Sequence, residues 1–184
     1  MSTPKKLRIR LLGDPVLRSV AQRVKSPRHP TIRKIVRDLV HTFEVYGGGG
    51  LSAPQVGHSL RIIVVGIRSS PRYPDIMPTR RHVMINPVFL TKSYSVEDGP
   101  EGCVSLPGLI ALKVPRHASV RIQWTTPGGR VLEGCFTGTF ARIIQHEMDH
   151  LDGLMFTDRL KNNKSLVSWK GYEKLCATDN VSQK

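Results

Sequence analysis

The sequence has few cysteines and no long apolar run, and each shortage excludes a class of protein. The three cysteines, Cys103, Cys135 and Cys176, are an odd number without regular spacing, so a disulfide framework is not expected and a reducing compartment is favoured. No apolar stretch approaches the ~20 residues that a membrane-spanning helix requires. We therefore expect a protein without a membrane span and with at least one thiol free for other work.

Acidic residues are also scarce. The chain has 14 Asp and Glu residues against 28 Lys and Arg, which gives a net charge of +14 and a pI of about 10.3. Such a charge favours contact with RNA, a ribosome or an acidic membrane surface, but it specifies none of them. The basic residues are scattered and are not interleaved with aromatic residues, a pattern typical of a well-solvated basic surface.

The order of the expected elements indicates the fold class. A chain of 184 residues can bury a core as one domain, so we expect a single domain over 1–184 with a C-terminal tail from about residue 165. Strands that are followed by a buried helix, without regular alternation, predict an α+β fold. We expect mainly antiparallel sheets packed around a central helix that carries the HEMDH sequence.

Hydrophobic periodicity places the individual elements. Apolar residues at helical spacing predict one helix before the four glycines at 47–50 and a second helix that ends at Gly153, with a weaker helical pattern in the tail. Runs of β-branched residues predict strands, and the sequence TTPGG predicts a hairpin. The expected helices are Thr31–Tyr46 and Thr139–Gly153, and the expected strands are Arg61–Ile67, His82–Leu90, Ala118–Trp124 and Arg130–Phe136.

The stretch QHEMDHLDG, Gln145–Gly153, carries an incomplete metal site. His146 and His150 are four residues apart, so a helix places them on one face with Glu147 beside them, as in a two-histidine metal site with a carboxylate base. A catalytic divalent ion normally takes three protein ligands and leaves one position open for water. The sequence therefore predicts a third ligand elsewhere in the chain.

Several residues compete for the third position. Zinc proteases of the HExxHxxGxxH type have a histidine where this chain has Phe156, whose ring cannot bind metal. Glu173 would be the third ligand if the chain is a zinc endopeptidase. Cys103 lies in the turn-like sequence EDGPEGCVSLP, where a pure packing role would be unusual. Cys135 and Cys176 are expected to be buried as small hydrophobic residues.

A third hypothesis treats the chain as a basic RNA- or ribosome-binding domain with a structural metal held by four protein ligands. The glycine-rich sequence GGGGLSAPQ does not favour a nucleotide enzyme, since it lacks the Gly-Lys-Ser/Thr ending of a phosphate-binding loop. In this loop Gly50 removes a side chain where another group must approach the backbone, and Gln55 offers an uncharged N–H donor.

Three stretches together resemble the signature motifs of peptide deformylases. They are GGGLSAPQVG (Gly48–Gly57), EGCVS (Glu101–Ser105) and QHEMDH (Gln145–His150), in this order and at these separations. GDPVLR (Gly13–Arg18) also resembles the start of that domain, so the resemblance covers most of the chain. It implies hydrolytic removal of the formyl group from the N-terminal formyl-methionine of newly synthesised polypeptides, with release of formate.

The resemblance also implies the metal and the catalytic groups. One divalent ion would be held by Cys103, His146 and His150, with Fe²⁺ as the physiological metal and Zn²⁺, Ni²⁺ or Co²⁺ as substitutes. Glu147 would act as general base and then general acid. The remaining implied residues are Gln55 and the backbone N–H of Val104 for the oxyanion, Gly49, Gly50 and Ile143 for the substrate, and a Glu101–Arg116 pair that orients the cysteine loop.

The motifs depart from the commonest family forms at three points. Those forms read GLAA and EGCLS where this chain has Ser52 and Val104, and the Val-Pro-Arg element lies one residue further from Cys103 than in the family pattern. GLSAPQ resembles organellar members, which implies the mitochondrial matrix, with the bacterial cytoplasm or a plastid as alternatives. The expected partners are N-formyl-Met polypeptides and, transiently, the ribosome, without DNA; the oligomeric state is left open.

Overall fold

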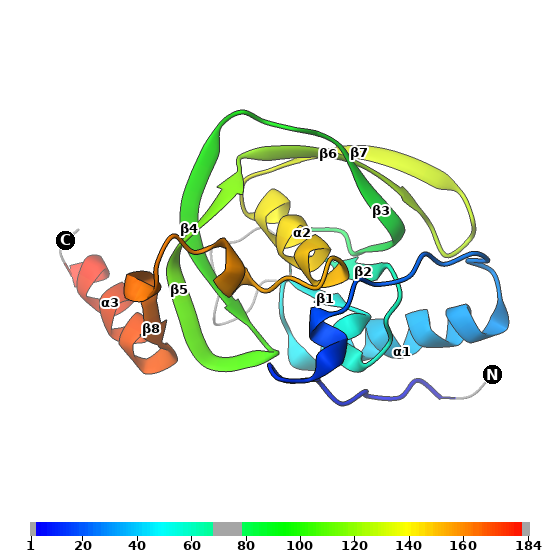
Figure 1. Cartoon of the computed structure of the whole chain (residues 1–184), viewed down its shortest axis with the longest axis horizontal. Coiled ribbons are helices and arrows are strands. Elements are labelled where there is room, and N and C mark those ends of the chain that lie inside the picture. The colour runs from blue at the N-terminus through cyan, green and yellow to red at the C-terminus, as the bar shows by residue number, and fades with distance from the viewer. Residues whose placement is uncertain (1–2, 68–78, 182–184) are drawn as a thin grey trace.

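Two antiparallel sheets surround a central helix, as the sequence predicts (Figure 1). The structure is a computed structural model that describes residues 3–67 and 79–181. Across the larger sheet the strands are β1 (Gly50–Ser52), β2 (Ile62–Val65), β3 (His82–Lys92), β6 (Ser119–Thr125) and β7 (Val131–Thr137). The smaller sheet contains β4 (Val96–Cys103), β5 (Leu106–His117) and β8 (Leu166–Ser168). The helices are α1 (Pro30–Tyr46), α2 (Gly138–Leu151) and α3 (Trp169–Val181).

Helix α1 agrees with its predicted range to within one residue at its start. Nδ1 of His29 accepts a hydrogen bond from the N–H of Thr31. Pro30 occupies the first turn, where an N–H would have no partner within the helix, so its missing N–H costs no hydrogen bond. Gly47 ends the helix in the left-handed conformation, at a φ of 68°. The apolar side of α1, with Leu39 and Phe43 fully buried, covers β1 and β2.

Helix α2 lies inside the molecule, between the two sheets (Figure 1). Ile144, Met148 and Leu151 pack into a core cluster with side chains of β2, β3 and β6. Burying each such side chain contributes about 1.5–3 kcal/mol of stability. Because the apolar side of α2 is fixed in this way, His146 and His150 are held toward β4, also away from solvent.

The other predicted elements had mixed outcomes. The hairpin around TTPGG is confirmed as β6 and β7, and both predicted central strands exist as β2 and β3. Of the turn-like sequence EDGPEGCVSLP, only Val104 and Ser105 form a turn: residues 97–103 lie in strand β4 and pair with the 12-residue strand β5, which was not predicted. In the tail, Leu166–Ser168 is a strand and the helix begins only at Trp169. None of the described helices is long and apolar enough to cross a membrane.

Candidate metal centre and active site

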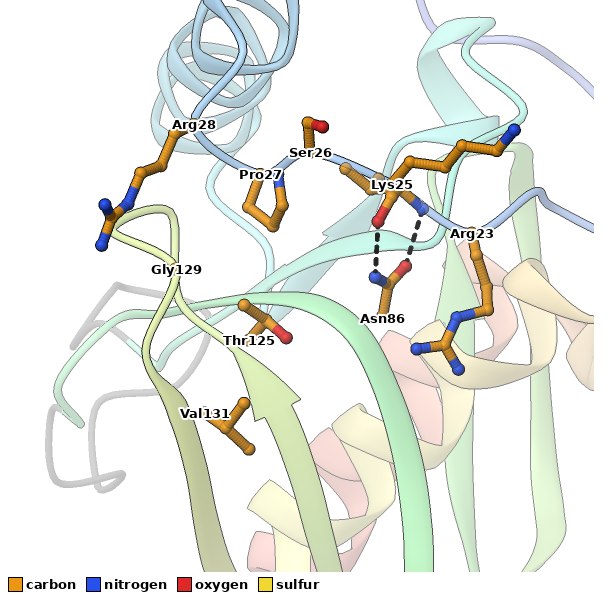
Figure 2. A pocket seen from close by; sticks show the side chains of 10 residues that line it. Arg23, Lys25, Ser26, Pro27, Arg28, Asn86, Thr125, Gly129 and Val131 are labelled. Carbon is orange, nitrogen blue, oxygen red and sulfur yellow. Dashed lines mark hydrogen bonds between the residues drawn. The ribbon is translucent and has the colours of Figure 1, made fainter.

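The structure has a cavity of about 530 Å³ between residues 23–28 and the β6–β7 turn, but this cavity does not have the geometry of an active site (Figure 2). Its cationic side chains, Arg23, Lys25 and Arg28, point in different directions and do not converge on one position (Figure 2). Asn86 is engaged with the backbone of Val24 through two hydrogen bonds. The cavity contains none of the site residues predicted from the sequence.

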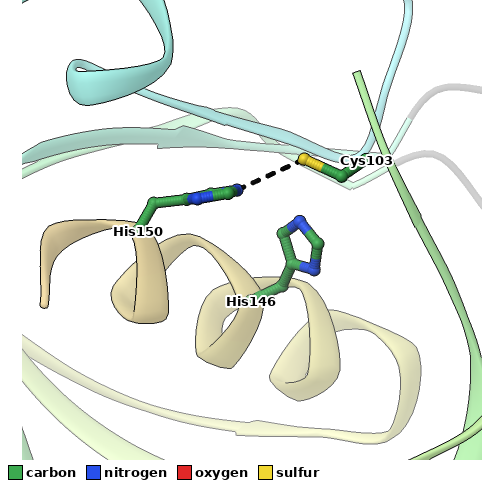
Figure 3. Close-up of side chains that lie close together, drawn as sticks. All are labelled: Cys103, His146 and His150. Carbon is green, nitrogen blue, oxygen red and sulfur yellow. Dashed lines mark hydrogen bonds between the residues drawn. The ribbon is translucent and has the colours of Figure 1, made fainter. Parts of the chain in front are cut away.

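Cys103, His146 and His150 instead meet between β4 and α2 (Figure 3). One candidate ligand atom from each residue lies within 4.8 Å of the others, and Nε2 of His150 is 3.4 Å from Sγ of Cys103. The two histidines share a face of α2 because they are four residues apart, and Cys103 is the last residue of β4. Among the described residues this is the only group of three or more His, Cys, Asp or Glu side chains that could hold a metal.

The donor set fits a tetrahedral divalent ion. With metal–nitrogen distances of about 2.0–2.1 Å and a metal–sulfur distance of about 2.3 Å, neighbouring ligand atoms lie about 3.5 Å apart. The separation of 3.4 Å between Sγ of Cys103 and Nε2 of His150 already has this value. The other ligand atoms lie within 4.8 Å, and a small movement of the side chains would bring them to the same separation. Three protein ligands leave the fourth position open, as in catalytic sites.

The surroundings of the two imidazoles favour metal binding through Nε2. Nδ1 of His146 lies 2.8 Å from Oε2 of Glu101, and the ring stacks against Phe156 at a centroid distance of 6.1 Å. A carboxylate at Nδ1 fixes the tautomer and leaves Nε2 free as a ligand. Burial lowers the pKa of His150, so its neutral, metal-binding form is favoured.

A buried ion-pair network supports this arrangement. Arg116 donates to both carboxylate oxygens of Glu101, at 2.8 and 3.0 Å, and to Asp149 at 2.6 Å. Burial raises the pKa of Glu101, but the hydrogen bonds from Arg116 and His146 outweigh it and bring the pKa down to about 2. Asp149 also accepts two hydrogen bonds from Arg159, so the network extends from His146 to the surface. At neutral pH Glu101 is therefore a permanent anion at His146.

Glu147 lies beside the histidines and is almost completely buried, with 3% of its surface exposed. Its Oε2 atom has no hydrogen-bond partner among the described residues. Burial raises the pKa of this carboxyl to about 7. A group that gains and loses a proton near neutral pH is suited to general acid–base catalysis.

Gln55 is held with its amide N–H pointing at the cysteine. Its Oε1 atom accepts hydrogen bonds from both the backbone N–H and the hydroxyl of Ser52, each at 2.8 Å. These two donors define which end of the amide is oxygen. Nε2 therefore faces Sγ of Cys103 at 3.3 Å and Oγ of Ser105 at 3.4 Å. An N–H donor is thus fixed at the edge of the candidate metal centre.

The remaining predicted residues lie around the same centre. Val104 is in the turn between β4 and β5, and its side chain packs against the core cluster of α1, β1 and β2. Gly50 begins β1 and Gly49 directly precedes it, and both lie against α2. A Cβ at Gly49 would come within 2.6 Å of Cδ1 of Ile143, and one at Gly50 within 2.6 Å of Glu147. The group that approaches the Gly50 backbone is thus Glu147.

Other residues considered as ligands lie elsewhere. Glu173 is exposed on α3 and accepts a hydrogen bond from the indole of Trp169 at 2.6 Å, so the zinc endopeptidase hypothesis loses its third ligand. Cys135 and Cys176 are exposed, and the prediction that they are buried is wrong. Phe156 is buried in the core and packs against His146.

Sequence reasoning gave no role to Asp149 and did not recognise what Ser52 does. Asp149 lies within the HEMDH motif on a fully buried turn of α2, and a buried carboxylate requires a cationic partner. That requirement could have pointed to an arginine. Ser52 gave no signal, because its contact with Gln55 depends on how the short helix Pro54–Val56 folds back on β1.

Comparison with known proteins identifies relatives over nearly the whole chain. The family model described as polypeptide deformylase matches residues 6–166. Peptide deformylase 2 from Nostoc sp. is 38% identical over 172 residues, which cover 94% of this chain and 96% of that protein. A class I type b peptide deformylase from Acinetobacter baumannii, solved with bound Met-Ala-Ser, superposes with a TM-score of 0.80 at 34% identity and covers 87% of this chain and 100% of its own. The Synechococcus elongatus peptide deformylase in complex with actinonin has a TM-score of 0.75 at 35% identity, over 88% of this chain and 82% of its own.

Proposed function

The chain belongs to the polypeptide deformylase family and is an enzyme that removes the N-formyl group from nascent peptides, and we propose that Cys103, His146, His150 and Glu147 carry out this reaction. The observation that carries the assignment of these residues is their convergence: three potential ligand atoms lie within 4.8 Å of one another, next to a buried carboxyl group.

Peptide deformylases depend on a metal, and the first three of these residues would hold one divalent ion. We propose Fe²⁺ as the ion in the cell because the resemblance to peptide deformylases implies it. Zn²⁺, Ni²⁺ and Co²⁺ are proposed as substitutes, because a thiolate with two imidazoles suits all four ions. When bound, such an ion supplies a nucleophilic water near neutral pH and polarises the formyl oxygen. The chain contributes the orientation: Glu101 holds His146 through Nδ1 at 2.8 Å, and burial keeps His150 neutral.

Glu147 is proposed to carry the proton. A carboxyl with a pKa of about 7 is partly ionised at neutral pH, so it can take the proton of the attacking water and return it to the leaving amine. The close fit between Glu147 and Gly50 supports this role, because the carboxyl group has little room to leave its position.

Gln55 and Val104 are proposed to stabilise the oxyanion that forms as the formyl carbon is attacked. The amide N–H of Gln55 already points to the centre, at 3.3 Å from Sγ of Cys103, and Ser52 prevents the amide from turning. The backbone N–H of Val104 follows Cys103 directly and would be the second donor. Donors that are fixed before the charge develops need no reorganisation during the reaction.

The substrate is proposed to lie along β1 as an added strand. This strand is the last of its sheet, so its outer edge has no neighbouring strand among the described residues. Backbone hydrogen bonds along such an edge bind an extended peptide without regard to its sequence, while a side-chain pocket gives specificity. We propose that Ile143 contributes to a methionine pocket, because the similar A. baumannii enzyme was solved with Met-Ala-Ser, a peptide that begins with methionine.

We also propose a contact with the ribosome and a location in the cell. The acid-free segment 15–37 is rich in arginine and lysine, which supports transient contact with ribosomal RNA. We also propose a location in the mitochondrial matrix, which rests on the GLSAPQ motif alone, since the three relatives named above are bacterial. A fluorescent fusion in the source cells would test the location, and salt-dependent cosedimentation with ribosomes would test the contact.

The assignment of the reaction can be tested with formyl-Met-Ala-Ser and the Fe²⁺-loaded protein. We expect one formate and one free amine for each peptide, loss of activity after removal of the metal by a chelator, and recovery when Fe²⁺ or Co²⁺ is added. Unformylated Met-Ala-Ser should remain intact. Cleavage between Met and Ala without formate would instead favour an endopeptidase.

A further inference from the structure

Arg142 joins the two parts of the chain that supply the candidate metal ligands. It lies on α2, four residues before His146, and 16% of its side-chain surface is exposed. Its Nη2 donates to the carbonyl of Glu97 at 2.7 Å, and its Nη1 donates to the carbonyl of Val114 at 2.6 Å. Nη1 also contacts Oε1 of Glu101 at 3.1 Å and, at 3.4 Å, the carbonyl of Gly99. All of these acceptors belong to the β4–β5 hairpin.

The guanidinium group is placed at an irregularity in that hairpin. Gly99 pairs with Val114, but Glu101, two residues later, pairs with Ala111, three residues earlier on β5. The extra residue makes a β-bulge, which disrupts the ladder and leaves backbone groups without their regular partners. Arg142 donates to the carbonyls of Gly99 and Val114, which form the last regular pair before the bulge, one on each strand.

Gly99 leaves the space that Arg142 fills. A Cβ at this position would lie 2.8 Å from Nη2 and 2.9 Å from Cζ of Arg142. The guanidinium could not keep its hydrogen bonds beside such a methyl group. A glycine on one element and an arginine on the other are thus matched in shape.

We propose that Arg142 is a positioning residue that locks the bulged β4–β5 hairpin to α2 and thereby sets the separation between Cys103 and the two histidines. The inference rests on the proposed metal site. Cys103 ends β4 only two residues after Glu101, whereas His146 lies one helical turn after Arg142. A movement of the hairpin relative to α2 would therefore separate the thiolate from the imidazoles, and metal sites tolerate only about 0.5 Å of such movement.

A simpler role for Arg142 would be to neutralise the charge of Glu101. Arg116 already does so through two hydrogen bonds, so a second cation is not required for that purpose. The contacts of Arg142 with carbonyl groups of two strands require the planar fork of a guanidinium, which lysine lacks. Arg142→Lys thus separates the two roles: it keeps the charge and loses the fork.

The test uses the full chain, stripped of metal and reconstituted with Co²⁺, whose absorption spectrum reports both the thiolate bond and the coordination geometry. The variants are Arg142→Ala, Arg142→Lys, Gly99→Ala and the double variant Gly99→Ala/Arg142→Ala. Arg121→Ala is the matched control, because Arg121 pairs with Glu133 on the exposed β6–β7 hairpin. Co²⁺ affinity is measured by competition with a chelator.

We expect each single variant to bind Co²⁺ about 10-fold more weakly, the size typical of losing a group that orients a ligand, with a weaker thiolate absorption band. The double variant should be no weaker than Arg142→Ala, because both changes remove one interaction. Arg121→Ala should match the unaltered protein.

Two outcomes would overturn the inference: unchanged Co²⁺ affinity and spectrum in Arg142→Ala, or full rescue by Arg142→Lys. If Arg142→Ala does not fold, Gly99→Ala and Arg142→Lys still decide between the roles. Failure of the unaltered protein to bind Co²⁺, or unchanged binding in Cys103→Ala, would count against the proposed metal site itself and not against Arg142 specifically.

Discussion

A methyl group on the α-carbon of Gly50 would lie 2.6 Å from Oε1 of Glu147, so the carboxylate of α2 occupies the space that the glycine leaves empty. The glycine-rich motif and the HEMDH motif are therefore coupled sterically, although nearly half the chain separates them. The glycine sets where the proton carrier can be.

The first prediction follows from this contact. Gly50→Ala should displace Glu147 and lower turnover about 100-fold, since a misplacement of about 1 Å can have that effect. Metal content should stay unchanged, because none of the three ligands is moved. Gly48→Ala is the matched control, since the nearest atom to its Cβ among the described residues, apart from its chain neighbours, is the carbonyl oxygen of Gly50 at 3.6 Å. Equal turnover of Gly50→Ala and the unaltered enzyme would show that Glu147 needs no fixed position.

Cys103→Ala should abolish tight metal binding, because two imidazoles alone leave an incomplete site. The exposed residues Cys135 and Cys176 provide controls, and their alanine variants should retain one metal ion per chain. Metal analysis after dialysis against a weak chelator measures the difference. Stoichiometric metal in the Cys103 variant would refute the ligand assignment.

Glu147→Gln should keep the metal and lower turnover by about 10²–10⁴, the usual contribution of positioned acid–base catalysis. The amide has almost the same shape, so the contact with Gly50 is kept while the proton acceptor is lost. Formate release and metal content should be measured on one preparation. Near-normal turnover would exclude Glu147 as the proton carrier.

Gln55→Ala should lower the turnover number by roughly 100-fold or more with a smaller change in KM, because an oxyanion donor is worth about 2.7–4 kcal/mol in the transition state. Ser52→Ala is the milder comparison, since the backbone N–H of residue 52 would still hold Oε1 of Gln55. If Gln55→Ala lowers Tm but leaves turnover unchanged at equal metal content, the role of Gln55 is structural and not catalytic.

Asp38 should make stability depend on pH. Its buried carboxylate accepts from the backbone N–H of Lys5 at 3.1 Å and from Nζ of Lys34 at 2.8 Å. Burial raises the pKa of Asp38, but these hydrogen bonds outweigh it, and the pKa in the folded protein is below the ordinary 3.8. The resulting stability is therefore present above that value and is lost as the pH falls through the folded-state pKa.

Asp38→Asn should accordingly lower Tm at pH 7, and the difference from the unaltered protein should shrink below about pH 4. Thermal unfolding followed by circular dichroism over this range gives the measurement. A difference that stays constant with pH would assign the effect to packing.

The elements that the sequence predicted correctly are those whose pattern reflects a simple environment. Helix α1 has one apolar side against a sheet, and α2 carries apolar residues at helical spacing, so periodicity located both. Strands β4 and β5 were not predicted, because their sequence does not reflect a simple environment. Gly99 and Pro100 are typical turn residues, yet both lie in strand β4, where Gly99 pairs with Val114 and its carbonyl accepts a hydrogen bond from Arg142. Tertiary contacts override local preference there.

In the candidate site, too, some residues were predicted from the sequence and others were not. His146, Glu147 and His150 lie close together in sequence, so helix geometry alone places them, and the family resemblance supplied Cys103 from another strand. The resemblance also supplied the Glu101–Arg116 pair. The supporting roles of Arg142, Asp149 and Ser52 were missed because their partners come from elsewhere in the fold. Arg142 reads as an ordinary helix residue until β4 is known to lie beside it, and Ser52 depends on the turn that brings Gln55 back.

The candidate metal ligands come from two distant segments, β4 and α2, and this affects how metal binding is coupled to folding. Cys103 and His150 are 47 residues apart in sequence, and an unfolded chain that bound one ion through both would have to close a loop of that length, at a cost of about 4 kcal/mol. The folded chain has closed this loop before the ion arrives. Metal should therefore bind the native state in strong preference to the unfolded one, and the melting temperature should rise with the concentration of free metal by mass action.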